Sequence, residues 1–406
     1  MRVLFADATS PDTITALTAQ GHECVLEPDL KARELPDRVV GFDVLVVRST
    51  KVTAAVIEGA DRLELIVRAG AGTNTIDTQA AAARGVLVAN VPGRNSIAVA
   101  ELTMGLLLAI DRAIPDNVAD ARAGRWDKKR HSRANGLFGS SLGIVGLGDI
   151  GLAVAERAAS FGIVVRAVSK PTRSAATEAR IASIGIEAVD SLRELVSGCD
   201  AVSLHVPAAA ETRGLVDTEF LGWMRPGAIL INTSRGDVVD EAALLTALDE
   251  RGLRAGLDVY ADEPATGHGP WESRLAAHPS VLATHHIGAS TEQAQRAIAA
   301  GVVDVVAAFA RGEPMNCVNL APLRIGSATI SIRHLDRVGV LADVFELLGR
   351  ARINVEHMEN RIFEGGQAAV AIIDVAGPLE ESLIAGLREV DNVLSVSVTR
   401  LHAAAG

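Results

Sequence analysis

The sequence is poor in aromatic side chains and in cysteine. Only 3% of its 406 residues are aromatic, so the 49% hydrophobic content comes mainly from Ala, Val, Leu and Ile. Such a composition suits helices packed on buried parallel strands, and it excludes disorder as the dominant state. Cys24, Cys199 and Cys317 lie far apart and form neither a metal-binding spacing nor an even-numbered disulfide set. We therefore expect a reduced, cytoplasmic protein without a metal site.

Positive charge is in deficit, and long apolar runs are missing. The net charge of −11 gives the chain no long-range attraction for a phosphate backbone, so nucleic acid is not an expected partner. The N-terminal MRVLFADA does not continue into a signal peptide, and later apolar runs are broken by glycine or charge before they could span a membrane. We expect neither secretion nor a membrane contact. The length suggests two or three domains.

The first part of the chain alternates short apolar runs with helical or turn-like stretches. Strand-sized runs lie at 2–6, 43–47, 63–67 and 85–89. They predict an α/β layer. Residues 96–110 have the length of a helix, begin with Ser and carry Glu101 in the early turns. This helix should lead into the next part of the chain, and Asn95 should lie directly before its first residue.

From residue 143 the pattern starts again. Candidate strands lie at 143–148, 164–168, 201–206, 228–233, 255–260 and 281–286, separated by helical intervals such as 151–161 and 241–251. This alternation predicts a doubly wound parallel sheet of the Rossmann type. Residues 291–310 lack proline and should form one long helix that returns to the first part of the chain.

After Gly312, Pro314 and Pro322 a third pattern follows. It reads strand, helix, two strands, helix and strand over residues 327–406. This order predicts a small ferredoxin-like α+β unit.

A glycine-rich turn follows the first strand of the Rossmann pattern. Gly146, Gly148 and Gly151 stand between that strand and an Ala-rich helix. In a phosphate loop the first glycine turns the chain, the second admits the pyrophosphate and the third lets helix meet strand. Backbone N–H groups at the helix start, here those of Asp149 and Ile150, receive the anion. The chain is therefore predicted to bind a nicotinamide dinucleotide.

The residues after strand 164–168 bear on the choice between NAD and NADP. An acidic side chain at this strand end accepts the ribose hydroxyls of NAD. Here the chain has Ser169, Lys170 and, shortly after, Arg173, with no carboxylate among them. These groups suit a ribose 2′-phosphate, but they could equally be solvated loop cations beside bound NAD. Both interpretations remain open.

Three later segments place polar groups at strand ends, where open α/β sheets bind their ligands. They contain Arg235, Asp258 with Glu263, and His286. Reduction of a carbonyl needs a proton donor that works near neutral pH, which His provides, and a neighbouring carboxylate fixes its tautomer. Arg can hold an α-carboxylate in a bidentate grip. Each residue taken alone also has a structural interpretation, as surface charge, loop acid or core histidine.

These residues lie in segments that resemble the D-isomer-specific 2-hydroxyacid dehydrogenases. The matching segments are RSTKVT (48–53), RAGAGTNTID (68–77), NVPGRNSIAVAE (90–101), the glycine loop, SLHVP (203–207), NTSRGDVVDE (232–241), GLDVYADEP (256–264) and HIGASTEQAQ (286–295). The match runs essentially from end to end, and the C-terminal unit resembles an ACT domain.

The resemblance implies three domains. A split flavodoxin-like substrate-binding domain would comprise 1–96 and 288–318, the NAD(P)-binding Rossmann domain 97–287, and the ACT regulatory domain 327–406. It also implies a homodimer or homotetramer, with the connector at 110–140 as a contact arm.

The resemblance also assigns roles to the residues. Arg235 would orient the substrate, His286 would exchange the proton and Glu263 would support His286. Asp258 would lie beside the nicotinamide carboxamide, and His205 would either order the cofactor-side loop or be structural. Further cofactor contacts would come from Pro207, Thr212, Thr233 and Gly288.

Substrate contacts are implied from the first domain, within the Ala71–Gly72 backbone and at Arg48, Lys51 and Asn95. Arg48 is the candidate partner for the phosphate of a phosphorylated 2-hydroxy acid. The run 128–130 (KKR) could meet the same phosphate or be a solvated connector. The resemblance thus implies a dehydrogenase for a phosphorylated 2-hydroxy acid. One alternative is a reductase for glyoxylate or hydroxypyruvate. The other is a non-catalytic nucleotide-sensing protein, against which the presence of Arg235, Glu263 and His286 argues.

Two positions depart from the family pattern. His285 stands where the family usually has Pro, which should be tolerated. Ser169 stands where it usually has Asp, so the resemblance suggests NAD while the residues present also permit NADP. In the ACT-like unit, RHLDRVGVL (333–341) matches the ligand loop, with His334, Asp336 and Asn354 as candidate effector residues. Because serine-inhibited enzymes commonly have Asn where this chain has Asp336, a serine site, another amino-acid site and a purely dimerising module all remain open.

Overall fold

The computed structural model describes residues 1–171, 173–264, 269–320 and 326–400. The chain divides into two compact units, Met1–Asn319 and Leu320–Gly406. None of the described helices combines the length and the apolar character needed to cross a lipid bilayer.

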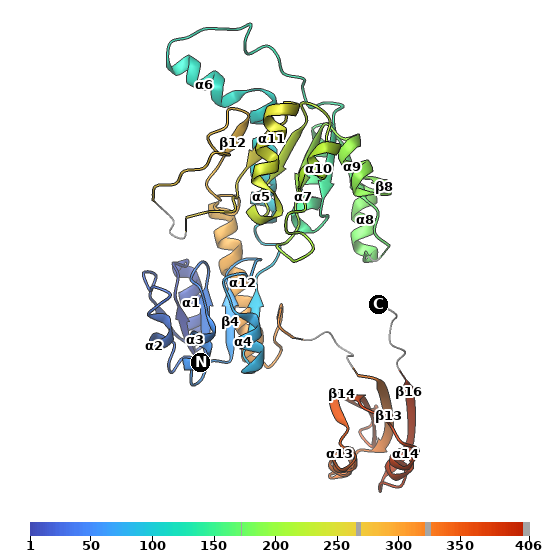
Figure 1. The fold of residues 1–406 in the computed structure, drawn as a ribbon. Helices are drawn as coiled ribbons and strands as arrows, with labels where there is room; N and C mark the ends of the chain where they lie inside the picture. The colour runs from blue at the N-terminus through green and yellow to red at the C-terminus, as the bar shows by residue number, and fades with distance from the viewer. Residues whose placement is uncertain (172, 265–268, 321–325, 401–406) are drawn as a thin grey trace. The chain divides into compact units, whose positions relative to one another are not determined.

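A five-stranded parallel sheet opens the chain, in the order β2-β1-β3-β4-β5 (Figure 1). This strand order confirms the predicted flavodoxin-like sheet. The strands are β1 (Arg2–Phe5), β2 (Glu23–Leu26), β3 (Val44–Val47), β4 (Leu65–Arg68) and β5 (Leu87–Asn90), and the connecting helices are α1 (Pro11–Ala19), α2 (Leu35–Arg38), α3 (Ala54–Gly59) and α4 (Thr78–Ala83). Strand β2 was not predicted, because it lies at the sheet edge and none of its residues is fully buried.

Two long helices connect this sheet to the next. Helix α12 (Glu292–Ala310) lies against the first sheet (Figure 1). Its Val302 and Val306 share a core with Val3 and Phe5 of β1. The predicted long helix that returns to the first sheet is thereby confirmed. Helix α5 (Ser96–Asp111) instead contributes Leu106 and Leu107 to the core of the second sheet.

The second sheet has seven parallel strands in the order β12-β11-β10-β9-β6-β7-β8. Its strands are β6 (Ser141–Val145), β7 (Val164–Val168), β8 (Glu187–Val189), β9 (Ala201–Leu204), β10 (Ile229–Asn232), β11 (Arg254–Leu257) and β12 (Val281–Ala283). The short edge strand β8 was not predicted, because only three residues form it and two of them are exposed. The strand order reverses between β6 and β9, and ligands bind at such a switch point in open α/β sheets.

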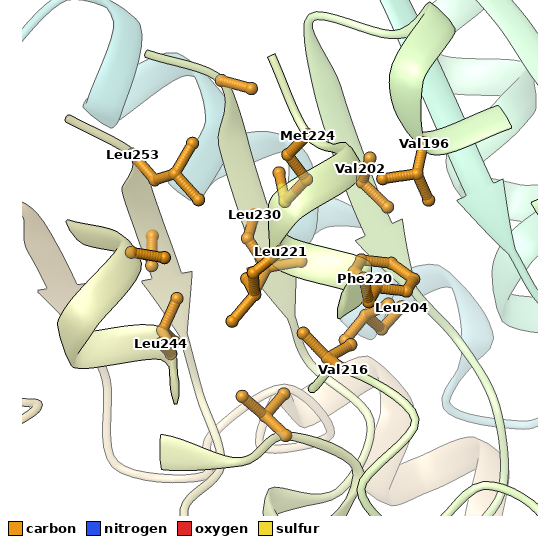
Figure 2. Packing of buried hydrophobic residues seen from close by; sticks show 14 of the residues in the cluster. Val196, Val202, Leu204, Val216, Phe220, Leu221, Met224, Leu230, Leu244 and Leu253 are labelled. Atoms are coloured by element: carbon orange, nitrogen blue, oxygen red, sulfur yellow. The ribbon is translucent and has the colours of Figure 1, made fainter. Parts of the chain in front are cut away.

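Helices cover both faces of this sheet. They are α7 (Asp149–Ser160), α8 (Ala175–Ile184), α9 (Leu192–Gly198), α10 (Thr218–Trp223) and α11 (Glu241–Arg251), with α6 (Ile114–Arg122) in the connector. Figure 2 shows Phe220 and Leu221 of α10 and Leu244 of α11 packed around Leu204 and Leu230 of the strands. Because both faces are buried, the strands read as continuous apolar runs rather than as alternating patterns.

The C-terminal unit is an antiparallel sheet with the order β14-β15-β13-β16. Its elements are β13 (Ala328–Leu335), α13 (Val340–Arg350), β14 (Asn354–Ile362), β15 (Ala368–Ala376), α14 (Glu381–Arg388) and β16 (Val393–Arg400). Ile330 and Ile332 of the sheet pack against Val344, Leu348 and Leu387 of the two helices. The predicted ferredoxin-like order is confirmed.

Candidate functional site

The glycine loop after β6 has the geometry of a phosphate cradle. Gly146 has φ +102, and a Cβ there would overlap the carbonyl of His205. A Cβ on Gly151 would overlap the carbonyl of Gly146, whereas one on Gly148 would meet nothing within 4 Å. The fold thus requires glycine at positions 146 and 151, whereas Gly148 leaves open space before the first turn of α7. The exposed Asp149 and the half-buried Ile150 begin that helix. This open space at a helix start fits the pyrophosphate of a dinucleotide.

The loop after β9 faces the same edge of the sheet. Thr212 Oγ1 donates to the Pro207 carbonyl at 2.6 Å and accepts from the Ala209 N–H at 3.0 Å, which closes the turn. His205 Nε2 lies 2.8 Å from Ser203 Oγ, and its Nδ1 is buried with no partner among the described residues. Desolvation lowers the pKa of His205 to about 3. Its ring is therefore neutral, although part of the residue reaches the surface.

Ser169 and Lys170 are exposed directly after β7. Arg173 lies nearby and donates to the carbonyl of Val168, the last residue of β7, at 2.6 Å.

The acid–base pair forms between residues 23 positions apart. His286 Nδ1 lies 2.7 Å from Glu263 Oε2, and Glu263 Oε1 accepts from the Tyr260 N–H at 3.0 Å. Burial opposes ionisation of Glu263, but the hydrogen bonds from His286 and Tyr260 and the charges of His286 and Arg235 outweigh it, so the pKa of Glu263 is lowered. The carboxylate therefore stays ionised and holds the His286 ring.

We expect the difference in unfolding free energy between the wild type and Glu263→Gln to depend on pH. The lowered pKa means that the Glu263 contribution is fully present above the ordinary carboxyl pKa and is lost as pH falls through the lower folded-state pKa. Urea unfolding should show the wild type about 1 kcal/mol more stable than the variant at pH 7, a value small because Glu263 is partly exposed. The difference should shrink towards pH 3, and a constant difference would contradict the ionic interaction.

Asp258 anchors the backbone that carries His286. Its side chain is 1% exposed. The carboxylate accepts from Thr284 Oγ1 at 2.6 Å, from the Ile287 N–H at 2.9 Å and from the N–H of the buried Gly288 at 2.8 Å. The His286 N–H donates to the Asp258 carbonyl at 2.8 Å. These bonds hold His286 at φ +52, an uncommon conformation for a residue other than glycine.

Arg235 follows β10 and is positioned by a turn that the sequence did not single out. Asn232 Nδ2 donates to the Arg235 carbonyl at 2.8 Å, and Asn232 Oδ1 accepts from Ser234 Oγ at 2.7 Å. The guanidinium reaches Gly72, where a Cβ would overlap it. The neighbouring Thr233 is buried, and its Oγ1 lies 3.0 Å from Thr103 Oγ1.

A cavity of about 790 Å³ lies beside the His286–Glu263 pair. Both parallel sheets contribute to it, with Arg48, Arg68 and Asn95 from the first part of the chain. His285 also lines it. Asn95 Oδ1 is buried with no partner among the described residues, so it is available to a ligand.

Arg68, which the sequence did not single out, is half-buried in this cavity. Desolvation, together with repulsion from Arg235 and Arg48, lowers the pKa of Arg68 to about 10. Its Nε has no partner among the described residues. The place of Arg68 at the end of β4 was the available signal, because Arg48 follows the end of the adjacent β3. Three arginines that repel one another favour an anionic ligand.

The remaining predicted substrate residues are placed differently. The Ala71 carbonyl accepts from Asn90 Nδ2 at 2.6 Å, beside the Gly72–Arg235 contact. Lys51 is exposed and is not among the residues that line the cavity. Lys128 and Lys129 are also exposed and outside it, and Arg130 instead donates to Asp120 at 2.9 Å.

The candidate effector residues do not come together within one C-terminal unit. His334 is buried, and its Nε2 lies 3.2 Å from Asn360 Oδ1. Asp336 follows the same strand end, and its N–H donates to the Gln367 carbonyl. Asn354 pairs with Ala376 on β15, whereas His334 pairs with Ala369. That separation along the strand corresponds to roughly 20 Å.

Two family models match the chain. The model described as "D-isomer specific 2-hydroxyacid dehydrogenase, NAD binding domain" matches residues 104–288, and the "ACT domain" model matches residues 328–385.

Similar proteins are found among curated sequences and solved structures. D-3-phosphoglycerate dehydrogenase of Methanocaldococcus jannaschii is 40% identical over 79% of this chain and 60% of its own length, and that of Bacillus subtilis is 38% identical over 79% and 59%. The chain therefore spans about 60% of the length of these relatives. The TT0316 protein of Thermus thermophilus is 34% identical, with a TM-score of 0.68 over 78% of this chain and 100% of its own. Formate dehydrogenase of Staphylococcus aureus, solved with NAD, is 28% identical, with a TM-score of 0.66 over 78% and 97%.

Proposed function

The chain belongs to the D-isomer specific 2-hydroxyacid dehydrogenase family, and from this we propose that it oxidises the 2-hydroxyl of 3-phosphoglycerate, or reduces 3-phosphohydroxypyruvate, in serine biosynthesis. The observation that carries the proposal is the His286–Glu263 pair beside a cavity lined by arginines. The relatives named as D-3-phosphoglycerate dehydrogenases support the choice of substrate.

His286 performs the proton transfer in this proposal. Because Nδ1 is engaged by Glu263, Nε2 is the nitrogen left to take the proton from the substrate 2-hydroxyl or to return it to the carbonyl oxygen. Glu263 fixes the ring orientation and favours the charged ring after the proton has been taken. A dinucleotide held at the glycine loop would supply the hydride chemistry at C2.

The arginines hold the two acidic groups of the substrate. Arg235 lies near enough to Glu263 for its charge to help lower the pKa of that carboxyl, and it would hold the substrate carboxylate and polarise the C2 oxygen. Arg48 would meet the phosphate, with Arg68 adding positive charge to the same cavity. A second anionic group on the substrate offsets the mutual repulsion of these cations, which favours the phosphorylated acid over glyoxylate or hydroxypyruvate.

Initial rates with 3-phosphoglycerate and D-glycerate test this function. D-glycerate has the same reacting centre and lacks only the phosphate. Loss of charge-assisted hydrogen bonds should lower kcat/KM about 100-fold for D-glycerate. Equal rates, or faster reduction of glyoxylate, would favour the alternative 2-keto acid reductase. The absence of turnover with every acid would favour a nucleotide-sensing protein.

Gln295 is expected to position Arg48. Arg48 Nη1 donates to Gln295 Oε1 at 2.9 Å across 247 positions of sequence, and Gln295 Nε2 donates to the Ala289 carbonyl at 3.3 Å. Gln295→Glu would bind the arginine as an ion pair and compete with the phosphate. We expect KM for 3-phosphoglycerate to rise about tenfold while kcat changes less than about twofold.

Arg296→Gln is the matched control for Gln295→Glu. Arg296 is exposed and its guanidinium pairs with Glu292 on the helix surface, so this variant should keep the wild-type KM. With D-glycerate, which lacks the phosphate, the two variants should have the same KM. A fall in kcat without a change in KM would exclude a positioning role for Gln295.

We also propose the three domains expected from the sequence: 1–96 with 288–318 for substrate, 97–287 for the dinucleotide and 327–406 for regulation. The ACT domain match supports an amino-acid effector, and the family resemblance of the sequence favours a homo-oligomer. Because one unit does not bring Asn354 to His334, an effector site that uses all three candidates needs more than one copy. A flat activity curve up to saturating serine would remove serine as the effector.

A further inference from the structure

The carboxyl end of β7 carries positive charge at the point where a Rossmann unit usually meets the adenosine ribose. This strand lies next to β6, from which the glycine loop begins. In NAD-binding units a carboxylate at the end of this strand accepts the ribose hydroxyls, whereas an arginine nearby accommodates a 2′-phosphate. Residues 169–171 (SKP) contain no carboxylate.

Arg173 is fixed at this strand end rather than extended into solvent. Its Nη2 donates to the Val168 carbonyl at 2.6 Å, and its Nη1 lies 3.7 Å from Glu178 Oε1. Only 15% of its side chain is exposed. Because a guanidinium has five N–H donors, these two contacts leave donors for a ligand. The charge of Arg173 is therefore held close to the position where the family has Asp.

Ser169 and Lys170 complete the group. Both are exposed, and neither side chain has a hydrogen-bond or ion-pair partner among the described residues. The Ser169 N–H donates to the Val189 carbonyl at 2.9 Å, so the ladder to β8 fixes the backbone at the point where the turn begins. A hydroxyl, an ammonium and a guanidinium are thus gathered within five residues at one strand end.

The acidic residues nearby do not replace the missing carboxylate. Glu178 belongs to α8 and faces Arg173. Asp190 follows β8, one strand further from the glycine loop, and its N–H donates to Glu194. A ribose with two free hydroxyls would find no carboxylate on residues 169–171 or at Arg173, whereas a phosphate dianion would meet two cations.

We propose that Ser169, Lys170 and Arg173 form a 2′-phosphate subsite and that the chain prefers NADP to NAD. The proposal rests on the function given above, because the glycine loop must hold the pyrophosphate for the ribose to reach β7. Arg173 supplies planar N–H donors to the phosphate oxygens, Lys170 supplies a mobile charge and Ser169 a hydroxyl donor.

Isothermal titration of the full chain with 2′,5′-ADP and with 5′-AMP, which lacks only the 2′-phosphate, tests the subsite without turnover. The two ligands allow the 2′-phosphate to be compared with its absence. We expect 2′,5′-ADP to bind at least about tenfold more tightly, since charge-assisted hydrogen bonds to the 2′-phosphate are added. The ratio should decrease as salt increases from about 0.05 to about 0.5 M, because the exposed Lys170 is screened.

Two variants and a control identify the residues. Ser169→Asp should reverse the preference, because its carboxylate repels the 2′-phosphate and accepts ribose hydroxyls. Arg173→Gln should reduce the ratio about tenfold. Arg180→Gln removes the same charge from the following helix α8 and should keep the wild-type ratio, because Arg180 pairs with Glu156 at 2.8 Å.

Equal or tighter binding of 5′-AMP would overturn the 2′-phosphate subsite and leave the dehydrogenase proposal intact. If neither nucleotide binds, the dinucleotide site itself is wrong, and both proposals fail. A wild-type ratio in Ser169→Asp would also overturn the subsite.

Discussion

His286→Asn will lower kcat/KM for 3-phosphoglycerate by about a thousandfold, because a positioned general acid–base typically contributes about 10² to 10⁴. The His286 side chain is half exposed and makes its main contact with Glu263, so its removal should cost about as much stability as Glu263→Gln, about 1 kcal/mol. Asn is the appropriate replacement, since it tolerates the left-handed backbone at φ +52 better than Ala does. The rates should be measured at saturating dinucleotide, together with urea unfolding.

The control for this result is the binding of ADP, which should be the same in His286→Asn and in the wild type. Glu263→Gln should cost less, about tenfold to 100-fold, because the neutral amide still contacts the ring but stabilises its charged form less well. If His286→Asn kept the wild-type rate, the proposed proton transfer would be wrong, whatever substrate the protein uses.

Gly146→Ala is the second substitution with a large expected effect, and it should lower both the stability of the fold and the affinity for ADP. The variant places an L side chain at φ +102 and against the His205 carbonyl. We expect the free energy of unfolding to fall by about 2 kcal/mol or more, from backbone strain and steric overlap. Binding of ADP should be lost, because the loop must shift to relieve the overlap. Urea unfolding and titration with ADP measure the two effects.

Gly148→Ala is the matched control. Gly148 has φ −80, and an added Cβ would meet no protein atom within 4 Å, so stability should stay within about 0.5 kcal/mol of the wild type. The added methyl occupies space left for the pyrophosphate, so ADP should bind at least about tenfold more weakly. Loss of stability in Gly148→Ala, or wild-type behaviour of Gly146→Ala, would contradict this assignment of the two glycines.

The regular elements were largely predictable, because local patterns determine them. Helix α11 begins and ends where the pattern placed it, and the C-terminal unit has the predicted order. The two strands that were missed, β2 and β8, are edge strands with little burial. Each of these strands forms by hydrogen bonding to a single neighbouring strand. Because this pairing does not require buried side chains, the sequence shows no periodic apolar pattern there.

The candidate site was only partly predictable. Polar residues at strand ends pointed to Arg235, Glu263 and His286, and the family resemblance gave their roles. The short bond between His286 and Glu263, the closeness of Arg235 to Gly72 and the half-buried Arg68 became visible only in three dimensions. In the C-terminal unit, the strand register separates Asn354 from His334, although the sequence analysis named both as candidate effector residues.

Local sequence was enough to establish the glycine loop and the sign of the charge after β7, since both depend on neighbours a few residues apart and on the strand and helix that flank them. The folded chain was needed to show which arginines share a cavity and which residue orients Arg48. Residues separated by as many as 247 positions meet there, and their burial and mutual repulsion, which lower the pKa of Arg68, exist only once the chain has folded.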